Sequence, residues 1–154
     1  MVGLLSFSNG ELFAIGAIQY LYQPATFGET TPRILLRVIV EGIPVIAIVD
    51  TGAPYVLCSP LVARRLRIDR TFALGTERIL IRGVWITGRL HRMHLQFRAE
   101  EGDNLDIDVT AFVPDPEWEE GWDDLPFFIG LSGCLERMRF AFDPNNDMFY
   151  FGPV

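Results

Sequence analysis

Every second residue between Arg33 and Glu41 is apolar, and this alternation constrains the fold more than any other feature of the sequence. The apolar positions are Ile34, Leu36, Val38 and Val40, with Arg33, Arg37 and Glu41 on the opposite face. A period of two is typical of a β-strand with one buried face. Residues 41–42 (Glu-Gly) then turn the chain into residues 43–49, which are apolar throughout and are expected to be buried on both faces. The two segments predict a hairpin that feeds a central strand.

The rest of the chain is divided into short β-rich segments by 14 glycines and 10 prolines. A long hairpin is expected at residues 79–97, with its tip at residues 82–89 and with positive φ permitted at Gly83 and Gly88. Further strands are expected at residues 105–113, 127–129, 140–142 and 148–151, and short helices at residues 61–66 and 132–138. The fold class predicted is mainly β, a small closed barrel or sandwich with one or two short helices.

Composition narrows the classes of partner. The 154 residues fit one domain and carry a net charge of −7, from 13 basic and 20 acidic residues. Nucleic acid is not an expected partner, because phosphate binding requires concentrated positive charge. The longest apolar stretch is too short to cross a bilayer and no signal peptide is recognisable, so we expect a cytoplasmic chain without a membrane partner. Cys58 and Cys134 are expected to be buried free thiols, and no metal site is expected.

The most informative chemistry lies where the apolar strand ends, in Asp50-Thr51-Gly52-Ala53. A carboxylate at the end of such a strand is costly to bury unless it is paired or hydrogen-bonded, which makes it a candidate functional group. Gly52 allows backbone amides to approach the carboxylate, and the hydroxyl of Thr51 can lock the loop. On these residues alone, an aspartate that caps a β-turn remains the alternative.

Two segments in this order resemble the retropepsin-like aspartic proteases, single-domain relatives of pepsin. Residues 48–53 (Ile-Val-Asp-Thr-Gly-Ala) are similar to the family's catalytic signature, and residues 127–131 (Phe-Phe-Ile-Gly-Leu) are similar to the segment that runs beside the catalytic loop. Residues 79–90 lie where the family has its flap. The resemblance covers residues 33–151 of one domain, 1–154, and leaves residues 1–23 as an N-terminal extension or extra hairpin.

The resemblance implies a retropepsin-like barrel and an aspartic endopeptidase that needs no cofactor or metal. The chain has one Asp-Thr-Gly, whereas the chemistry needs two carboxylates, so a homodimer is implied in which Asp50 of both chains activates a water. Thr51 would interlock across the two-fold axis and Gly52 would donate its amide to the carboxylate. Strand 148–151 is expected at the dimer interface. An extended peptide is the expected substrate, bound by Ala53 and by the flap residues Gly83, Val84, Trp85 and Ile86.

Some features depart from the family's pattern. Trp85 and Ile86 make the flap tip bulky, and Ser132 stands near the position where an arginine-containing pair often follows Gly130. Two alternatives therefore stay open: a catalytically silent retropepsin-like module for dimerisation or peptide binding, and a β-barrel that binds an apolar small molecule. The acidic residues 115–124 are expected to form a surface loop, and His91 and His94 to lie on opposite faces of one strand.

Overall fold

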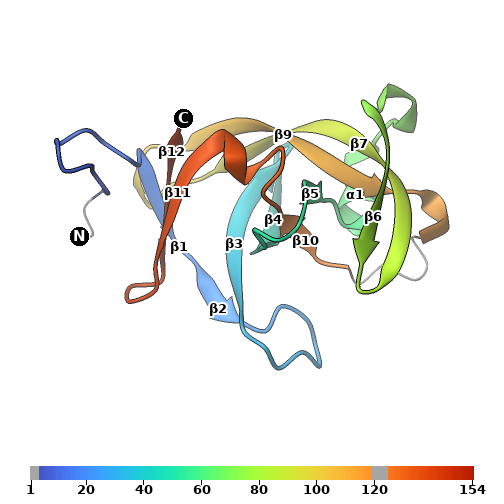
Figure 1. Ribbon diagram of the computed structural model, residues 1–154, viewed down its shortest axis with the longest axis horizontal. Helices are drawn as coiled ribbons and strands as arrows, with labels where there is room; N and C mark the ends of the chain where they lie inside the picture. The colour runs from blue at the N-terminus through green and yellow to red at the C-terminus, as the bar shows by residue number, and fades with distance from the viewer. Residues whose placement is uncertain (1–3, 119–124) are drawn as a thin grey trace.

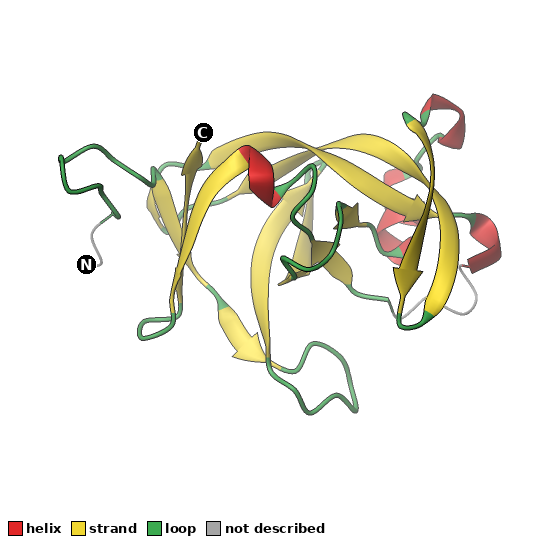
Figure 2. Ribbon diagram, in the orientation of Figure 1, coloured by secondary structure: helices red, strands yellow, loops and turns green. Residues whose placement is uncertain are grey.

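Strands form most of the described chain, and helices are few and short (Figure 2). The computed structural model describes residues 4–118 and 125–154. Its strands are β1 (Gly16–Gln19), β2 (Leu21–Gln23), β3 (Arg33–Val40), β4 (Ile43–Val49), β5 (Val56–Leu57), β6 (Gly75–Ile81), β7 (Val84–Phe97), β8 (Glu101–Gly102), β9 (Leu105–Pro114), β10 (Phe127–Ile129), β11 (Met138–Asp143) and β12 (Met148–Pro153). Its helices are α1 (Pro60–Leu66) and the short 3-10 turns η1 (Arg70–Phe72), η2 (Pro116–Trp118) and η3 (Leu135–Arg137). The predicted mainly β fold is confirmed.

The larger sheet closes on itself. Its strands are ordered β2-β3-β4-β10-β5-β9-β7-β6, and β3 also pairs with β7 through residues 39–40 and 95–96. This pairing joins β3, β4, β10, β5, β9 and β7 into a closed barrel, as the sequence predicts. Side chains fill the interior of a barrel this small. Those buried here include Leu36, Val38, Leu95, Val109 and Ile129.

The smaller sheet, ordered β11-β12-β1-β8, lies at the end of the molecule that holds both termini (Figure 1). Phe149 and Phe151 of β12 contact Phe97 of β7, with ring centroids 5.8 and 5.6 Å apart, and so join this sheet to the barrel. Both edges of β12 are paired within the chain, with β1 and with β11. β12 therefore has no free edge for pairing with a strand of another chain, and the expected place of residues 148–151 at the dimer interface stays a prediction.

The N-terminal residues contribute to both sheets. β1 pairs with β12 and β8, whereas β2 adds to the edge of the barrel sheet beside β3. Before them, Ser6 and Leu12 form an isolated antiparallel bridge. Residues 16–19 and 21–23 are thus built into the fold as strands.

β6 and β7 form a hairpin that extends from the barrel (Figure 1). Its turn is Arg82-Gly83, both with positive φ (51° and 80°), as a two-residue hairpin turn requires. The tip is therefore shorter than the expected residues 82–89. Gly88 lies inside β7 instead of at a turn, and its missing side chain leaves room for the carbonyl oxygen of Val113, 2.5 Å from where a Cβ would stand.

Helix α1 follows the sequence signals closely. The hydroxyl of Ser59 accepts a hydrogen bond from the amide of Val62 at 3.3 Å, Pro60 begins the helix, and Arg67 ends it in the left-handed conformation. The second expected helix, at residues 132–138, is wrong: only the 3-10 turn η3 forms there. Ser132 pairs in a parallel bridge with Pro54 instead of capping a helix.

Two other expectations need correction or fall outside the structure. β4 is not buried on both faces, because Pro44 and Ile46 point outward and Ile46 is 56% exposed. Most of the acidic segment, residues 119–124, lies outside the described residues; its beginning forms η2.

Candidate active site

Asp50 stands where β4 leaves the barrel. The amide of Asp50 donates to the carbonyl of Ile129 at 3.0 Å and so extends the parallel pairing of β4 with β10 by one residue. The chain then turns sharply, because the amide of Ala53 donates back to the carbonyl of Asp50 at 3.1 Å. The carboxylate is consequently held at a fixed point on a tight loop instead of on a mobile surface segment.

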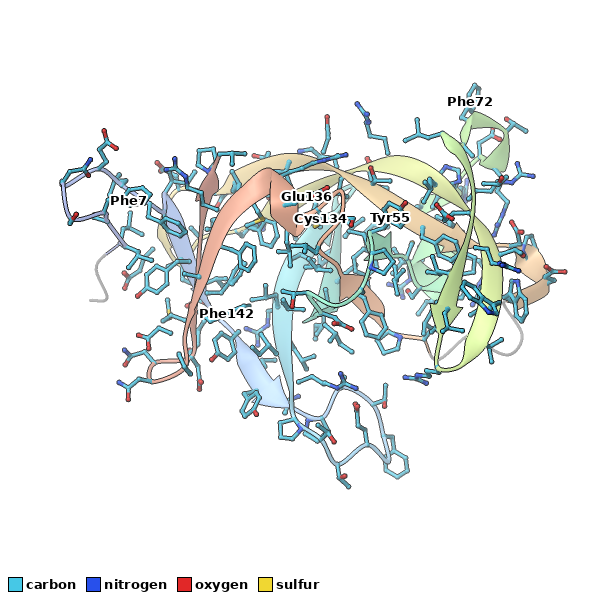
Figure 3. The ribbon with its side chains drawn as sticks, viewed as in Figure 1. Phe7, Tyr55, Phe72, Cys134, Glu136 and Phe142 are labelled. Atoms are coloured by element: carbon cyan, nitrogen blue, oxygen red, sulfur yellow. The ribbon has the colours of Figure 1, made fainter. Side chains whose placement is uncertain are left out.

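A second loop supports the first from the side. After β10, the amide of Leu131 donates to the carbonyl of Ala53 at 2.9 Å, and Gly130 lies between the two loops. A Cβ on Gly130 would stand 2.0 Å from the carbonyl oxygen of Tyr55 and 2.5 Å from that of Ala53. Only glycine allows this approach. The two segments that carry the resemblance are thus in direct contact; Tyr55 and Cys134, which follow them in the chain, are labelled near the centre of Figure 3.

The carboxylate of Asp50 is half-buried and only partly satisfied. Its Oδ1 accepts a hydrogen bond from the amide of Gly52 at 3.0 Å, the contact expected from the sequence. Within residues 4–118 and 125–154, its Oδ2 and the hydroxyl of the exposed Thr51 have no hydrogen-bond partner. One oxygen of Asp50 and the side chain of Thr51 are therefore available to a substrate, a water or another chain.

A pocket of about 240 Å³ opens beside Asp50. Its walls are the loop after β4, strand β5, the end of β6 and residues of β3 and β10. Most of the lining is apolar, including Ala53, Pro54, Leu57, Ile81 and Phe128. The charged residues that line it are Asp50, Arg33 and Arg82. Asp50 is thus the single carboxylate among the described residues of this pocket.

The expected substrate-binding residues separate into two groups. Ala53 lines the pocket, and Gly83, Val84 and Trp85 are exposed near the hairpin turn. Ile86 is fully buried, in a cluster with Ile79, Ile81, Leu57, Phe112 and Leu125. A substrate cannot reach Ile86 in this arrangement; the residue anchors the hairpin to the barrel, which corrects its expected role.

Polar contacts also tie the hairpin to its surroundings. The hydroxyl of Tyr55, in the Asp50 loop, donates to Glu77 of β6 at 3.3 Å. Partial burial and the neighbouring Glu77 raise the pKa of Tyr55, which keeps the hydroxyl a donor. At the hairpin's other strand, Thr87 accepts a hydrogen bond from the indole of Trp118 at 3.2 Å. Sequence patterns gave no signal for these contacts, nor for Arg33 and Arg82 in the pocket, because each joins residues far apart in the chain.

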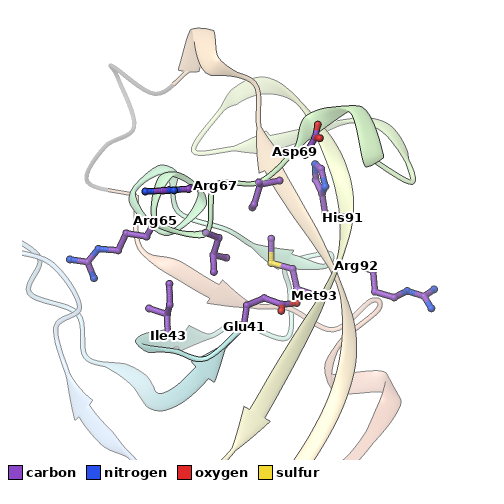
Figure 4. A pocket seen from close by; sticks show the side chains of 10 residues that line it. Glu41, Ile43, Arg65, Arg67, Asp69, His91, Arg92 and Met93 are labelled. Atoms are coloured by element: carbon purple, nitrogen blue, oxygen red, sulfur yellow. The ribbon is translucent and has the colours of Figure 1, made fainter.

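A larger cavity of about 510 Å³ lies elsewhere, between the end of α1 and β7 (Figure 4). His91 lines it and is 6% exposed, and its Nε2 has no hydrogen-bond partner. Burial, and then the charges of Arg70 and Arg89, lower the pKa of His91. Arg65 and Arg92, on the rim, point away from the centre of the cavity (Figure 4). His94 is exposed and forms a 3.1 Å contact with Asp106, so the two histidines lie on opposite faces as expected.

The remaining candidate groups are the two cysteines and possible metal ligands. Cys58 and Cys134 are buried free thiols, as predicted, and burial raises the pKa of each to about 12. Within the described residues, no three His, Cys, Asp or Glu side chains gather as a metal site. None of the helices in that part of the chain is both long and apolar enough to span a membrane.

The chain was compared with protein families, curated proteins and solved structures, and only solved structures are similar to it. No protein-family model and no curated protein matches the chain. A retropepsin-like aspartic protease from Rickettsia conorii is similar in structure, with a TM-score of 0.58 at 18% identity over 90% of this chain and 94% of that one. Two weaker similarities are to the EIAV protease (TM-score 0.49, 14% identity, 70% and 86% coverage) and to the retroviral protease-like domain of Ddi1 from Leishmania major (0.44, 18%, 79% and 94%). The chain, with its closed barrel and its Asp-Thr-Gly loop against Gly130, has the retropepsin-like fold.

Proposed function

We propose that the chain is an aspartic endopeptidase whose active site forms between two copies of the chain. The observation that carries the proposal is the position of Asp50: it is fixed on a tight loop at the edge of an apolar pocket, with one carboxylate oxygen unpartnered in the described chain. A carboxylate that a supported loop presents to a mostly apolar pocket is typical of a binding or catalytic site.

The chemistry requires a second carboxylate. Hydrolysis of a peptide by this route needs one group to take a proton from the attacking water and another to donate a hydrogen bond to the scissile carbonyl. Two carboxylates that face one another share a proton, because both cannot be ionised cheaply, and the pair therefore supplies both functions. The described pocket lining contains one carboxylate, so a second copy of the chain would supply the other through a two-fold interface.

The other residues of the loop have roles that fit this arrangement. The amide of Gly52 orients the carboxylate, and the exposed hydroxyl of Thr51 would bond to the partner chain. The β6–β7 hairpin would act as the flap that covers an extended peptide and excludes water. Its contacts with the substrate would come from the exposed pocket residues Leu80 and Arg82, since Ile86 is buried.

The test compares the wild-type chain with Asp50→Asn on a diverse peptide library, alongside the native mass of each by light scattering. We expect both to have twice the chain mass and only the wild type to cleave. Asp108→Asn, at an exposed aspartate of β9, is the matched control and should cleave normally. A strictly monomeric wild type, or undiminished cleavage by Asp50→Asn, would refute the proposal. A dimer that binds peptides without cleaving them would establish the silent module instead.

A further inference from the structure

Two arginines border the pocket beside Asp50, although the chain as a whole is acidic. Arg33 begins β3 and Arg82 occupies the hairpin turn, so the two cations come from different elements. Most of the remaining lining is apolar, with residues such as Leu57, Ile81 and Phe128. The pocket therefore combines an apolar floor with a cationic rim.

Arg82 is the freer of the two cations. It is exposed at the turn, and it has no hydrogen bond or ion pair with any residue in the described ranges. A guanidinium is always charged and presents donors in a planar fork that matches a carboxylate. The turn thus holds a permanent charge at the rim of the pocket without an internal counter-ion.

Arg33 is partly neutralised. Its Nε lies 3.0 Å from Oε1 of Glu29, four residues earlier, and this hydrogen bond is the main reason that the pKa of Glu29 is lowered. The pair partly satisfies the guanidinium of Arg33, whose side chain remains 43% exposed. Arg33 is therefore a weaker contributor than Arg82.

We propose that this pocket selects peptides that carry an acidic side chain beside an apolar one, with Arg82 as the main specificity-determining residue. The inference rests on the proposed function in one respect: it takes an extended peptide as the ligand. Arg82 has no counter-ion within the described ranges and Arg33 is only partly neutralised by Glu29, so an acidic side chain gains more beside these two cations than a basic one does. If the electrostatic field of the whole chain, with its net charge of −7, outweighs the two arginines, the pocket prefers basic peptides instead.

The test measures peptide binding separately from cleavage. Fluorescence anisotropy measures how tightly the Asp50→Asn chain binds a set of labelled peptides. Each peptide has the same apolar sequence with a single Glu, Gln or Lys, placed at each position in turn. An exposed ion pair contributes up to about 1 kcal/mol, so at the best position we expect Glu to bind roughly two- to fivefold more tightly than Gln, with Lys weakest. The preference should shrink as salt is raised.

Variants in the same background assign the effect to Arg82. Arg82→Asn keeps a residue that tolerates positive φ and should abolish most of the preference for Glu, whereas Arg82→Glu should reverse it in favour of Lys. Arg78→Gln is the matched control: Arg78 belongs to the same hairpin, but its guanidinium stacks on Trp85 at 4.5 Å and does not line the pocket. This control should keep the preference for Glu.

The outcomes separate the two proposals. Equal affinity for Glu and Gln peptides, tighter binding of Lys peptides, or a preference that survives Arg82→Asn would overturn the inference even if the wild type cleaves. Charge-dependent binding without cleavage by the wild type would support the inference and refute the endopeptidase. Failure of every peptide to bind would refute both.

Discussion

Replacement of Gly130 by alanine should loosen the Asp50 loop without touching the carboxylate. A Cβ at this position would lie 2.0 Å from the carbonyl oxygen of Tyr55 and 2.5 Å from that of Ala53. Both contacts are with backbone, so no rotamer change can relieve them, and the two loops would have to move apart by about 1 Å.

The cost follows from the contacts that such a shift would break. Overpacking in a close-packed region costs about 1–3 kcal/mol. The hydrogen bond from Leu131 to Ala53, at 2.9 Å, would be weakened or lost, which costs about 1 kcal/mol more. We therefore expect the free energy of unfolding to fall by roughly 2–4 kcal/mol.

Urea denaturation at one fixed protein concentration measures this difference, since the stability of an assembling chain depends on concentration. Hydrogen exchange should show faster exchange of the amides of Asp50 and Leu131. Gly75→Ala is the matched control, because a Cβ there meets no atom within 4 Å. If Gly130→Ala were as stable as this control, with both amides still protected, the packing argument would be refuted.

Two other predictions concern His91 and the β6–β7 hairpin. His91 is buried and its pKa is lowered, so the unfolded chain binds a proton before the folded chain does as the pH falls below about 6.5. Stability should therefore decrease from pH 7.5 to 5.5, and His91→Gln should flatten this dependence; an unchanged slope would contradict the assignment. Ile86→Ala should cost about 2–5 kcal/mol and the half-exposed Trp85→Ala less than about 1, as judged by thermal or urea unfolding, and the reverse order would mean that the hairpin does not pack through Ile86.

Local patterns in the sequence were sufficient for much of the fold. The alternation of apolar and polar residues predicted β3, and the capping pair Ser59-Pro60 predicted the start of α1. The apolar strand that ends at Asp50 located the candidate site. Each of these depends on residues that are close in the chain. The resemblance of residues 48–53 and 127–131 to two family segments also predicted that the two loops lie side by side, and they meet at Gly130.

The errors concern features that depend on distant partners. An apolar run suggested burial of both faces of β4, yet Ile46 is exposed because no other segment covers it in the described chain. Gly88 suggested a turn, but its missing side chain makes room for Val113 of another strand. The placement of Arg33 and Arg82 at one pocket likewise results from the closure of the barrel and the length of the hairpin, which no local pattern encodes.

The central claim is that catalysis needs one Asp50 from each of two chains, and mixed dimers test it most directly. Wild-type and Asp50→Asn chains would be unfolded together, refolded in known ratios, and assayed for peptide cleavage. If both carboxylates are required, activity follows the square of the wild-type fraction, so an equal mixture retains about one quarter of the wild-type activity. An equal mixture that retains about half would show that each chain works alone and would contradict the account.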